Sequence, residues 1–338
     1  MCNMQKHGKQ TWIFSTPPKL IDGAAVVGPD EGKGPLAEDF DLVYADLWAG
    51  ENSFEWAEKK MMQDACDMLL KRNQDKQVDF FLAGDLLDQI ISSSFTARAL
   101  EIPYIGIFGA CSTSMLGLAL ASFLVDSGAA KYVLAATSSH NNTAEKQFRY
   151  PNEYGAQKPP ESQYTVSAAG AGLVGAGGNG PCILGTTIGK IVDMGISDPN
   201  NMGAAMAPAA ADTIYRHFED LHLTPDAYDL IITGDLGQVG HNITKELLKQ
   251  KGILLTDENF VDCGLMIYDR KKQPVFSGGS GCGCCASVLY GHFLKRLNRG
   301  ELKKILVVAT GALMSPLSYQ QKETIPGIAH GVVLESKS

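Results

Sequence analysis

Cys111 is the residue best placed to do chemistry in this chain. It follows Gly109-Ala110 at the expected end of an apolar strand and precedes an apolar helical segment. A thiol at a helix N-terminus meets unsatisfied N–H groups and a positive potential, which favour a thiolate and can bind an anion. The alternative is a small buried residue that fits a tight turn, and both interpretations stay open on position alone.

Three further cysteines, Cys282, Cys284 and Cys285, lie close together in a Gly-rich segment. A zinc site needs a second pair of ligands at a suitable spacing, and no Cys or His pair lies near in the sequence. We therefore expect no metal here, and we interpret these cysteines as small residues that let a helix pack closely.

Ser138, Ser139 and His140 could supply a nucleophile and a base. Neighbours in sequence point in different directions, however, and the partners of a catalytic triad come from elsewhere in the fold. A polar pocket wall is the expected role of these three residues.

The Gly-rich stretch 170–180 has the composition of a phosphate-binding loop, but no Gly-Lys-Ser/Thr closes it. We expect a flexible loop in this stretch and no nucleotide site.

A weak internal repeat organises these residues. The segment Asp79-Phe-Phe-Leu-Ala-Gly-Asp85 recurs 150 positions later as Asp229-Leu-Ile-Ile-Thr-Gly-Asp235. Each copy is followed by a Gly-rich turn, an apolar segment and a second strand-like run, which is the order of a right-handed crossover unit. The paired aspartates that end the two segments, Asp85 and Asp235, fit caps or turn formers at strand ends better than an acid/base pair. The repeat predicts a pseudo-symmetric α/β protein.

The expected halves are 1–184, including an irregular loop over 140–180, and 185–338. In the first half, periodicity predicts a helix over 53–72, short strands at 80–83 and 104–108, and a helix over 112–127 that is buried on every side. The second half is expected to contain a helix over 209–221 and a loop over 315–330.

The composition limits the possible functions. The chain has 338 residues, 45% of them hydrophobic, and a formal net charge of −8 without a basic stripe, so nucleic-acid binding is not expected. No apolar run approaches the ~20 residues that cross a bilayer, and the N-terminus has no apolar core of a signal peptide. Eight cysteines without a disulfide pattern are typical of a reducing compartment, and we expect synthesis in a cytosol.

Gly109-Ala-Cys111-Ser-Thr and Gly278-Gly-Ser-Gly281 resemble motifs of the thiolase and β-ketoacyl synthase superfamily, which implies its five-layer αβαβα fold. A closer resemblance, from about Lys9 to the end, is to the stage V sporulation protein AD family of endospore-forming bacteria. It depends on segments such as Ala83-Gly-Asp-Leu-Leu, Glu145-Lys-Gln-Phe-Arg-Tyr-Pro, Asn201-Met-Gly-Ala-Ala-Met-Ala-Pro and Ala309-Thr-Gly-Ala-Leu-Met-Ser-Pro-Leu.

The departures from the condensing enzymes affect the expected activity. Those enzymes pair the nucleophilic cysteine with a histidine on a second-half strand and with a histidine or asparagine at the next helix start. Here Gly234 or Asp235 aligns with the first position and Cys282 with the second. A carboxylate and a thiol are not oxyanion donors at neutral pH, so Claisen condensation is not expected.

The closer resemblance implies a non-catalytic protein without a cofactor. It would bind dipicolinic acid, or its calcium chelate, for uptake into the developing spore and release at germination. The residues that the resemblance and the expected pocket suggest as ligands are Cys111, Ser138, Ser139, His140, Thr165, Arg149 as a charge partner, and His330 from the C-terminal loop.

The resemblance also implies partners and a location. The partners are other proteins of the same spore transport system, the location is peripheral at the inner spore membrane, and a homodimer is expected by analogy. One alternative is an acyltransferase or β-ketoacyl synthase that uses Cys111 as a thioester nucleophile, and another is a scaffold with a vestigial cavity.

Overall fold

The computed structural model describes residues 4–149 and 158–337. Within them, ten strands form two sets of five with the same order and directions. In each set the first strand is antiparallel to the second and the second to the third, whereas the remaining neighbours are parallel. The first set, in spatial order, is β3 (Lys19–Val27), β9 (Ala168–Gly175), β7 (Tyr132–Ser139), β5 (Phe80–Asp85) and β6 (Tyr104–Gly106). The second is β10 (Cys182–Ile188), β15 (Gly327–Glu335), β14 (Lys304–Ala312), β11 (Leu230–Thr233) and β12 (Phe260–Asp262).

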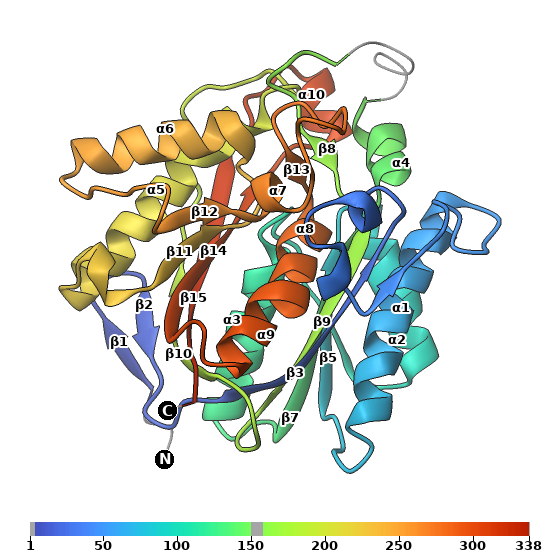
Figure 1. The fold of residues 1–338 in the computed structure, drawn as a ribbon, viewed down its shortest axis with the longest axis vertical. Helices are drawn as coiled ribbons and strands as arrows, with labels where there is room; N and C mark the ends of the chain where they lie inside the picture. The colour runs from blue at the N-terminus through green and yellow to red at the C-terminus, as the bar shows by residue number, and fades with distance from the viewer. Residues whose placement is uncertain (1–3, 150–157, 338) are drawn as a thin grey trace.

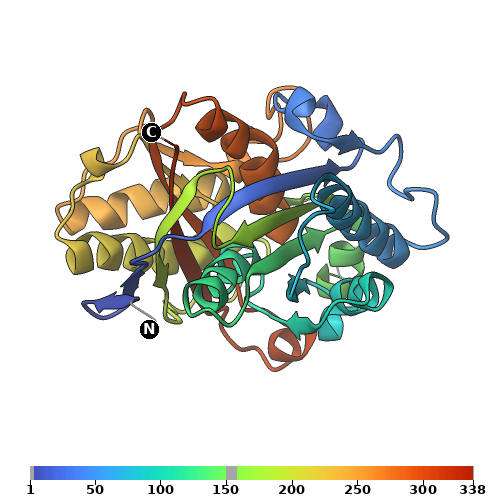
Figure 2. The ribbon, with the colours of Figure 1, turned by 90° about the horizontal axis from the view of Figure 1, so that it is seen from below.

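The two sets join where Cys182 of β10 pairs with Lys19 of β3. Helices cover both outer faces and fill the space between the sets, so the layers alternate as α, β, α, β, α (Figures 1 and 2). The expected five-layer fold is therefore confirmed. The outer helices are α1 (Phe54–Arg72) and α2 (Ile91–Leu100) on the first set, and α5 (Met202–Leu221) and α6 (Gly237–Gln250) on the second. The middle layer contains α3 (Thr113–Asp126), α8 (Cys282–Val288) and α9 (Leu294–Asn298).

Smaller elements complete the described chain. A hairpin of β1 (Gln5–His7) and β2 (Thr11–Ile13) extends from β10, and β4 (Leu42–Val43) pairs with β3. A separate two-stranded sheet joins β8 (Tyr164–Thr165) to β13 (Gly279–Ser280). The short helices are α4 (Asn141–Ala144), α7 (Cys263–Met266) and α10 (Pro316–Gln320).

The internal repeat has a structural counterpart at the starts of β5 and β11. The Asp79 carboxylate accepts hydrogen bonds from the backbone N–H groups of Lys131 and Tyr132, at 2.6 and 3.1 Å. The Asp229 carboxylate accepts the equivalent pair from Lys303 and Lys304, at 2.6 and 2.8 Å. Both aspartates thus hold the start of the neighbouring strand in each half.

The loop predicted for the Gly-rich stretch 170–180 is wrong for residues 170–175, which belong to the buried strand β9. Two of its glycines, Gly170 and Gly172, are explained by the middle helix layer. A Cβ at Gly170 would lie 2.6 Å from the Cβ of Ala286, and one at Gly172 would lie 2.5 Å from the ring of Tyr290. Glycine here lets the helices pack directly on the strand. The expected division after residue 184 falls inside β10.

The helix expected over 112–127 lies in the middle layer as α3, but it is not buried on every side. Leu120 and Phe123 are only partly buried.

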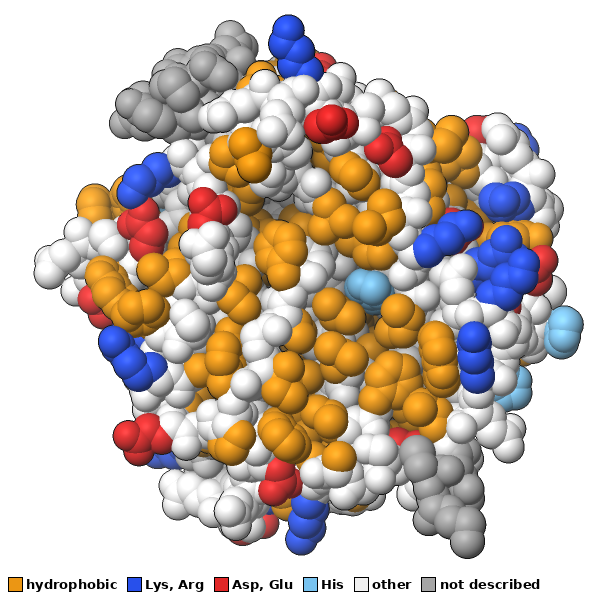
Figure 3. Space-filling view, turned by 180° about the vertical axis from the view of Figure 1, so that it is seen from behind, with side chains coloured by type: hydrophobic (Ala, Val, Ile, Leu, Met, Phe, Trp, Pro, Cys, Tyr) orange, Lys and Arg blue, Asp and Glu red, His pale blue; other side chains and the backbone are white. Residues whose placement is uncertain are grey.

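Apolar side chains cover much of the centre of one face of the molecule, with charged side chains mostly toward its edge (Figure 3). No helix of residues 4–149 or 158–337 is both long and apolar enough to span a membrane.

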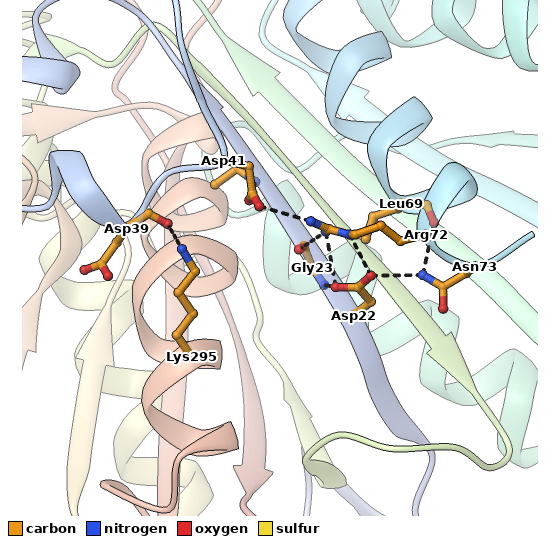
Figure 4. A network of polar contacts seen from close by, with 9 residues as sticks. Asp22, Gly23, Asp39, Asp41, Leu69, Arg72, Asn73 and Lys295 are labelled. Atoms are coloured by element: carbon orange, nitrogen blue, oxygen red, sulfur yellow. Dashed lines mark hydrogen bonds and ion pairs between the residues drawn. The ribbon is translucent and has the colours of Figure 1, made fainter.

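Helix α1 has defined ends. Ser53 caps its N-terminus by accepting a hydrogen bond from the Trp56 N–H at 3.2 Å, as its side-chain chemistry favours. At its C-terminus Arg72 bonds Asp22 at 2.9 Å and Asp41 at 3.0 Å, and Asn73 bonds Asp22 at 2.9 Å (Figure 4). These contacts attach the end of the outer helix to strand β3.

Candidate functional site

A pocket reaches from the surface to Cys111, and both halves of the chain line it. Its volume is about 610 Å³ when the open mouth is included. The polar side chains along it are Cys111, Glu145, Gln163, Thr165, Asn200 and Ser280. The other lining residues are Leu86, Phe108, Ala110, Ala144, Phe148, Met202, Ala312 and Met314. A largely apolar wall with a few polar groups is typical of small-molecule sites.

Cys111 lies in a tight turn that the surrounding backbone fixes. Ala110 has a φ of 49°, in the left-handed region that residues with a side chain seldom adopt. Ser112 and Thr113 close the turn by donating their hydroxyls to the carbonyls of Gly109 and Ala110, both at 2.6 Å. Strand β14 passes very close, because a Cβ at Gly311 would lie 2.5 Å from the Gly109 carbonyl oxygen.

Of the two interpretations that the sequence leaves open for Cys111, the structure favours the small buried residue in a tight turn over the thiolate. Burial raises the pKa of the Cys111 thiol well above its ordinary value, and the nearby Asp235 carboxyl raises it further. Only 7% of Cys111 is exposed, so the cost of desolvating a thiolate exceeds what the start of α3 supplies. The surroundings of Cys111 therefore favour the neutral thiol over the thiolate.

Asp235 is the buried acid beside that thiol. Its carboxyl accepts hydrogen bonds from Thr310 Oγ1 at 2.5 Å, from the Gly281 N–H at 3.0 Å and from Ser280 Oγ at 3.2 Å. Burial raises the pKa of Asp235 although these bonds and one from Cys111 oppose the rise. The group links β11, β14 and the start of α8 beneath the pocket.

Asp85, the matching acid of the first half, has only a local structural role. It accepts hydrogen bonds from the Leu87 N–H at 3.0 Å and from the N–H and hydroxyl of Ser93 at 2.8 and 2.6 Å. The interpretation as a turn former is confirmed for Asp85. Asp235 also binds backbone, but its contact with Cys111 places it next to the pocket.

Ser138, Ser139 and His140 do not line the pocket. Ser138 Oγ donates to Glu58 Oε1 at 3.1 Å, and Ser139 Oγ donates to the Val166 carbonyl at 2.7 Å. His140 Nε2 lies 2.9 Å from the Leu47 carbonyl, and burial lowers the pKa of its ring. The three side chains are committed to backbone and core contacts, so the expected pocket wall is wrong for them.

Thr165 does line the pocket, and it pairs with Ser280 of β13. His330 does not line the pocket, and it belongs to strand β15 and not to the expected C-terminal loop. It pairs with Ala309 and Ile188 on the two neighbouring strands, and its Nδ1 accepts a hydrogen bond from the Gly189 N–H at 3.3 Å. The side chain of Arg149 lies outside the described residues.

Sequence reasoning missed four polar residues of the pocket: Glu145, Gln163, Asn200 and Ser280. Gln163 Nε2 donates to the carbonyls of Asp235 at 2.5 Å and Gly279 at 3.3 Å. Glu145 and Ser280 lie within segments that carry the family resemblance, but nothing in those segments shows which side chains face the pocket. Gln163 and Asn200 have no sequence signal.

The three clustered cysteines have packing roles. The Cys282 thiol donates to the Ser138 carbonyl at 2.9 Å and the Cys284 thiol to the Gly234 carbonyl at 3.5 Å. A Cβ at Gly283, between them, would lie 2.3 Å from the Ala168 carbonyl oxygen. The small residues let α8 pack on β9. In residues 4–149 and 158–337, no three His, Cys, Asp or Glu side chains form a group that could hold a metal ion.

Two matched halves around a buried cysteine turn define a thiolase-like protein. The chain aligns in three dimensions with 3-oxoacyl-[acyl-carrier-protein] synthase III from Aquifex aeolicus VF5, over 94% of this chain and 99% of the other, at 15% identity and a TM-score of 0.59. It aligns equally well with human mitochondrial 3-ketoacyl-CoA thiolase, over 96% and 100%, at 10% identity and a TM-score of 0.59. These similarities establish the fold alone.

The sequence comparisons are more specific. The sequence model of the Stage V sporulation protein AD family matches residues 8–335. A curated relative, Stage V sporulation protein AD of Bacillus subtilis (strain 168), is 51% identical over 334 residues, which are 98% of each chain. The chain therefore belongs to the Stage V sporulation protein AD family and has a role in sporulation.

Proposed function

We propose that this protein binds dipicolinate, or its calcium chelate, in the Cys111 pocket without catalysing a reaction on it. Its role would be uptake of the ligand into the developing spore and release at germination. The family membership supports the sporulation part of this proposal. The pocket supports the binding part, since it combines apolar walls with hydroxyl, amide and thiol groups, as small-molecule sites do.

The contact between Cys111 and Asp235 is the main observation that supports a non-catalytic role. A condensing enzyme needs an activated thiol and an oxyanion donor. Here the pKa of Cys111 is raised and the adjacent ionisable group is a buried carboxyl. No histidine is among the described residues that line the pocket.

Titration calorimetry of the purified protein with dipicolinate, with and without calcium, tests the proposal. Benzoate and acetyl-CoA serve as controls, and intact-mass spectrometry after incubation with acetyl-CoA detects a thioester. We expect saturable dipicolinate binding and no mass shift. An adduct on Cys111 without dipicolinate binding would instead favour the acyltransferase or β-ketoacyl synthase alternative.

Membrane docking and self-association are also part of the proposed function. We propose peripheral docking at the inner spore membrane on other proteins of the same transport system, and a homodimer. The end strand β6 offers an edge for pairing, and its Ile105 and the nearby Phe108 are 37% and 53% exposed. An apolar sheet edge of this kind supports self-association. Light scattering of the purified chain would test the homodimer.

A further inference from the structure

Cys182 differs in accessibility and surroundings from the other cysteines that the structure describes. It is partly exposed, whereas the remaining described cysteines are buried. It lines an open surface cavity of about 1380 Å³ together with Lys19, Lys303 and Lys337, and Glu335 is the one carboxylate among the described lining residues. A partly exposed thiol among several cations is the setting that reactive cysteines have in proteins.

The backbone holds Lys19 directly opposite Cys182. The two residues form the antiparallel pair that joins β3 to β10. Backbone hydrogen bonds flank this pair on both sides, at 3.0 Å from the Leu20 N–H and at 2.8 Å from the Ile183 N–H. In such a non-hydrogen-bonded pair the two side chains lie on the same face of the sheet and are at their closest. The amine and the thiol are therefore brought together by the strand register.

The two reactive atoms are also in direct contact. Lys19 Nζ donates a hydrogen bond to Cys182 Sγ at 2.6 Å. Within the described part of the chain, Lys19 has no carboxylate partner that competes for its side chain. Groups that are held in position in this way react far more readily than the same groups free in solution.

We propose that Lys19 and Cys182 form an oxidative cross-link, in which peroxide joins the Lys19 nitrogen to the Cys182 sulfur. Peroxide first converts the thiol to a sulfenic acid: an S–O bond forms, the O–O bond breaks and one water leaves. Lys19 loses its extra proton to solvent, and the neutral amine attacks the sulfur. An S–N bond then forms and the sulfenic oxygen leaves as a second water. The sulfur loses two electrons and peroxide gains two, so no other reactant is needed.

The cross-link would connect the two halves of the fold where their strands meet. The joined residues are 163 positions apart in the sequence. A link across so long a loop restricts the unfolded chain and therefore stabilises the folded protein. Neither Lys19 nor Cys182 lines the Cys111 pocket, so the inference is independent of the proposed ligand.

Peptide mapping of the full chain before and after treatment with hydrogen peroxide tests the cross-link. We expect the peptides that contain Lys19 and Cys182 to become joined with the loss of two hydrogen atoms. Lys19→Arg keeps the positive charge without the amine, so Cys182 of this variant should proceed to a sulfinic or sulfonic acid and stay unlinked. Lys303→Arg is the matched control, because Lys303 lines the same cavity while Lys19 contacts the thiol. This variant should link as the parent protein does.

Two outcomes of the mapping would overturn the inference. One is a parent protein in which Cys182 is oxidised but never joined to Lys19, and the other is a link to Lys303 or Lys337 instead. Joined peptides that carry one further oxygen atom would confirm the pairing and assign an oxygen-bridged bond in place of the direct S–N bond.

Thermal unfolding gives a second readout. We expect peroxide treatment to raise the melting temperature of the parent protein by about 3 °C or more, and to give no rise in Lys19→Arg. A fully linked parent protein that melts at the same temperature as the reduced protein would contradict the stabilising role of the cross-link.

Discussion

The thiol of Cys111 donates a hydrogen bond to the buried carboxyl of Asp235, and this contact raises the pKa of the thiol while it opposes the rise that burial causes in the pKa of the carboxyl. The two residues come from different halves, from the turn before α3 and from the end of β11. A neutral thiol is a weaker nucleophile than a thiolate, so this contact supports the proposed binding role.

The reactivity of Cys111 should reflect this contact. Because its pKa is raised by burial and by Asp235, we expect alkylation by iodoacetamide at pH 7.5 at least about tenfold slower than at Cys182, which is partly exposed. Asp235→Asn removes the neighbouring negative charge and should speed the reaction. Peptide mass spectrometry over time measures both rates. Faster labelling of Cys111 than of Cys182 in the parent protein would contradict the prediction.

A second buried acid should make stability depend on pH. Burial, and then the charge of Asp85, raise the pKa of Glu58 from 4.5 to about 8. A folded-state pKa above the unfolded value favours folding at low pH, and this contribution is lost as pH rises through about 8. Glu58→Gln should therefore gain stability relative to the parent between pH 5 and pH 9, by roughly 2 kcal/mol or more.

Urea unfolding at pH 5, 7 and 9 measures this difference. Glu38→Gln is the control, because Glu38 is exposed and its substitution should give the same difference at each pH. The buried histidines act in the opposite sense, since burial lowers the pKa of His217 to about 3 and that of His330 to about 4. Both variants keep them, so their effect cancels in the comparison. A Glu58→Gln difference that is flat across pH would refute the assignment.

The fold was predictable from the sequence because the internal repeat includes aspartates that make the same contact in both halves. Asp79 and Asp229 hold the start of a neighbouring strand in the same way, so similar residues persist there. The site was less predictable, because it depends on contacts between segments far apart in the chain. Gly170 and Gly172 of β9 indicate a loop when only the local sequence is considered, and the close packing of Ala286 and Tyr290 on them explains why glycine occurs in a strand there. Ser138 and His140 are polar, yet their partners come from α1 and the loop at Leu47.

Gly311 should be essential to the shape of the Cys111 turn. A Cβ there would lie 2.5 Å from the Gly109 carbonyl oxygen and 3.2 Å from the Cys111 nitrogen, both rigid backbone atoms. We expect Gly311→Ala to lower the free energy of unfolding by about 1–3 kcal/mol and to weaken ligand binding. Gly177→Ala is the matched control, since a Cβ at Gly177 meets nothing within 4 Å. Equal unfolding midpoints for the two variants would disprove the close approach.

Substitution of a residue that lines the pocket should affect ligand binding more than substitution of a predicted ligand that lies outside the lining. Thr165 lines the pocket. Thr165→Val keeps the shape of the side chain but removes the hydroxyl, so we expect dipicolinate affinity to fall about threefold to tenfold. His330 lies inside β15 and outside the pocket lining, so His330→Gln should change affinity by less than about twofold although it can lower stability. Calorimetry on both variants, with thermal unfolding to confirm that each is folded, measures the contrast. A larger loss for His330→Gln than for Thr165→Val would mean that the ligand binds elsewhere and that the Cys111 pocket is not the site.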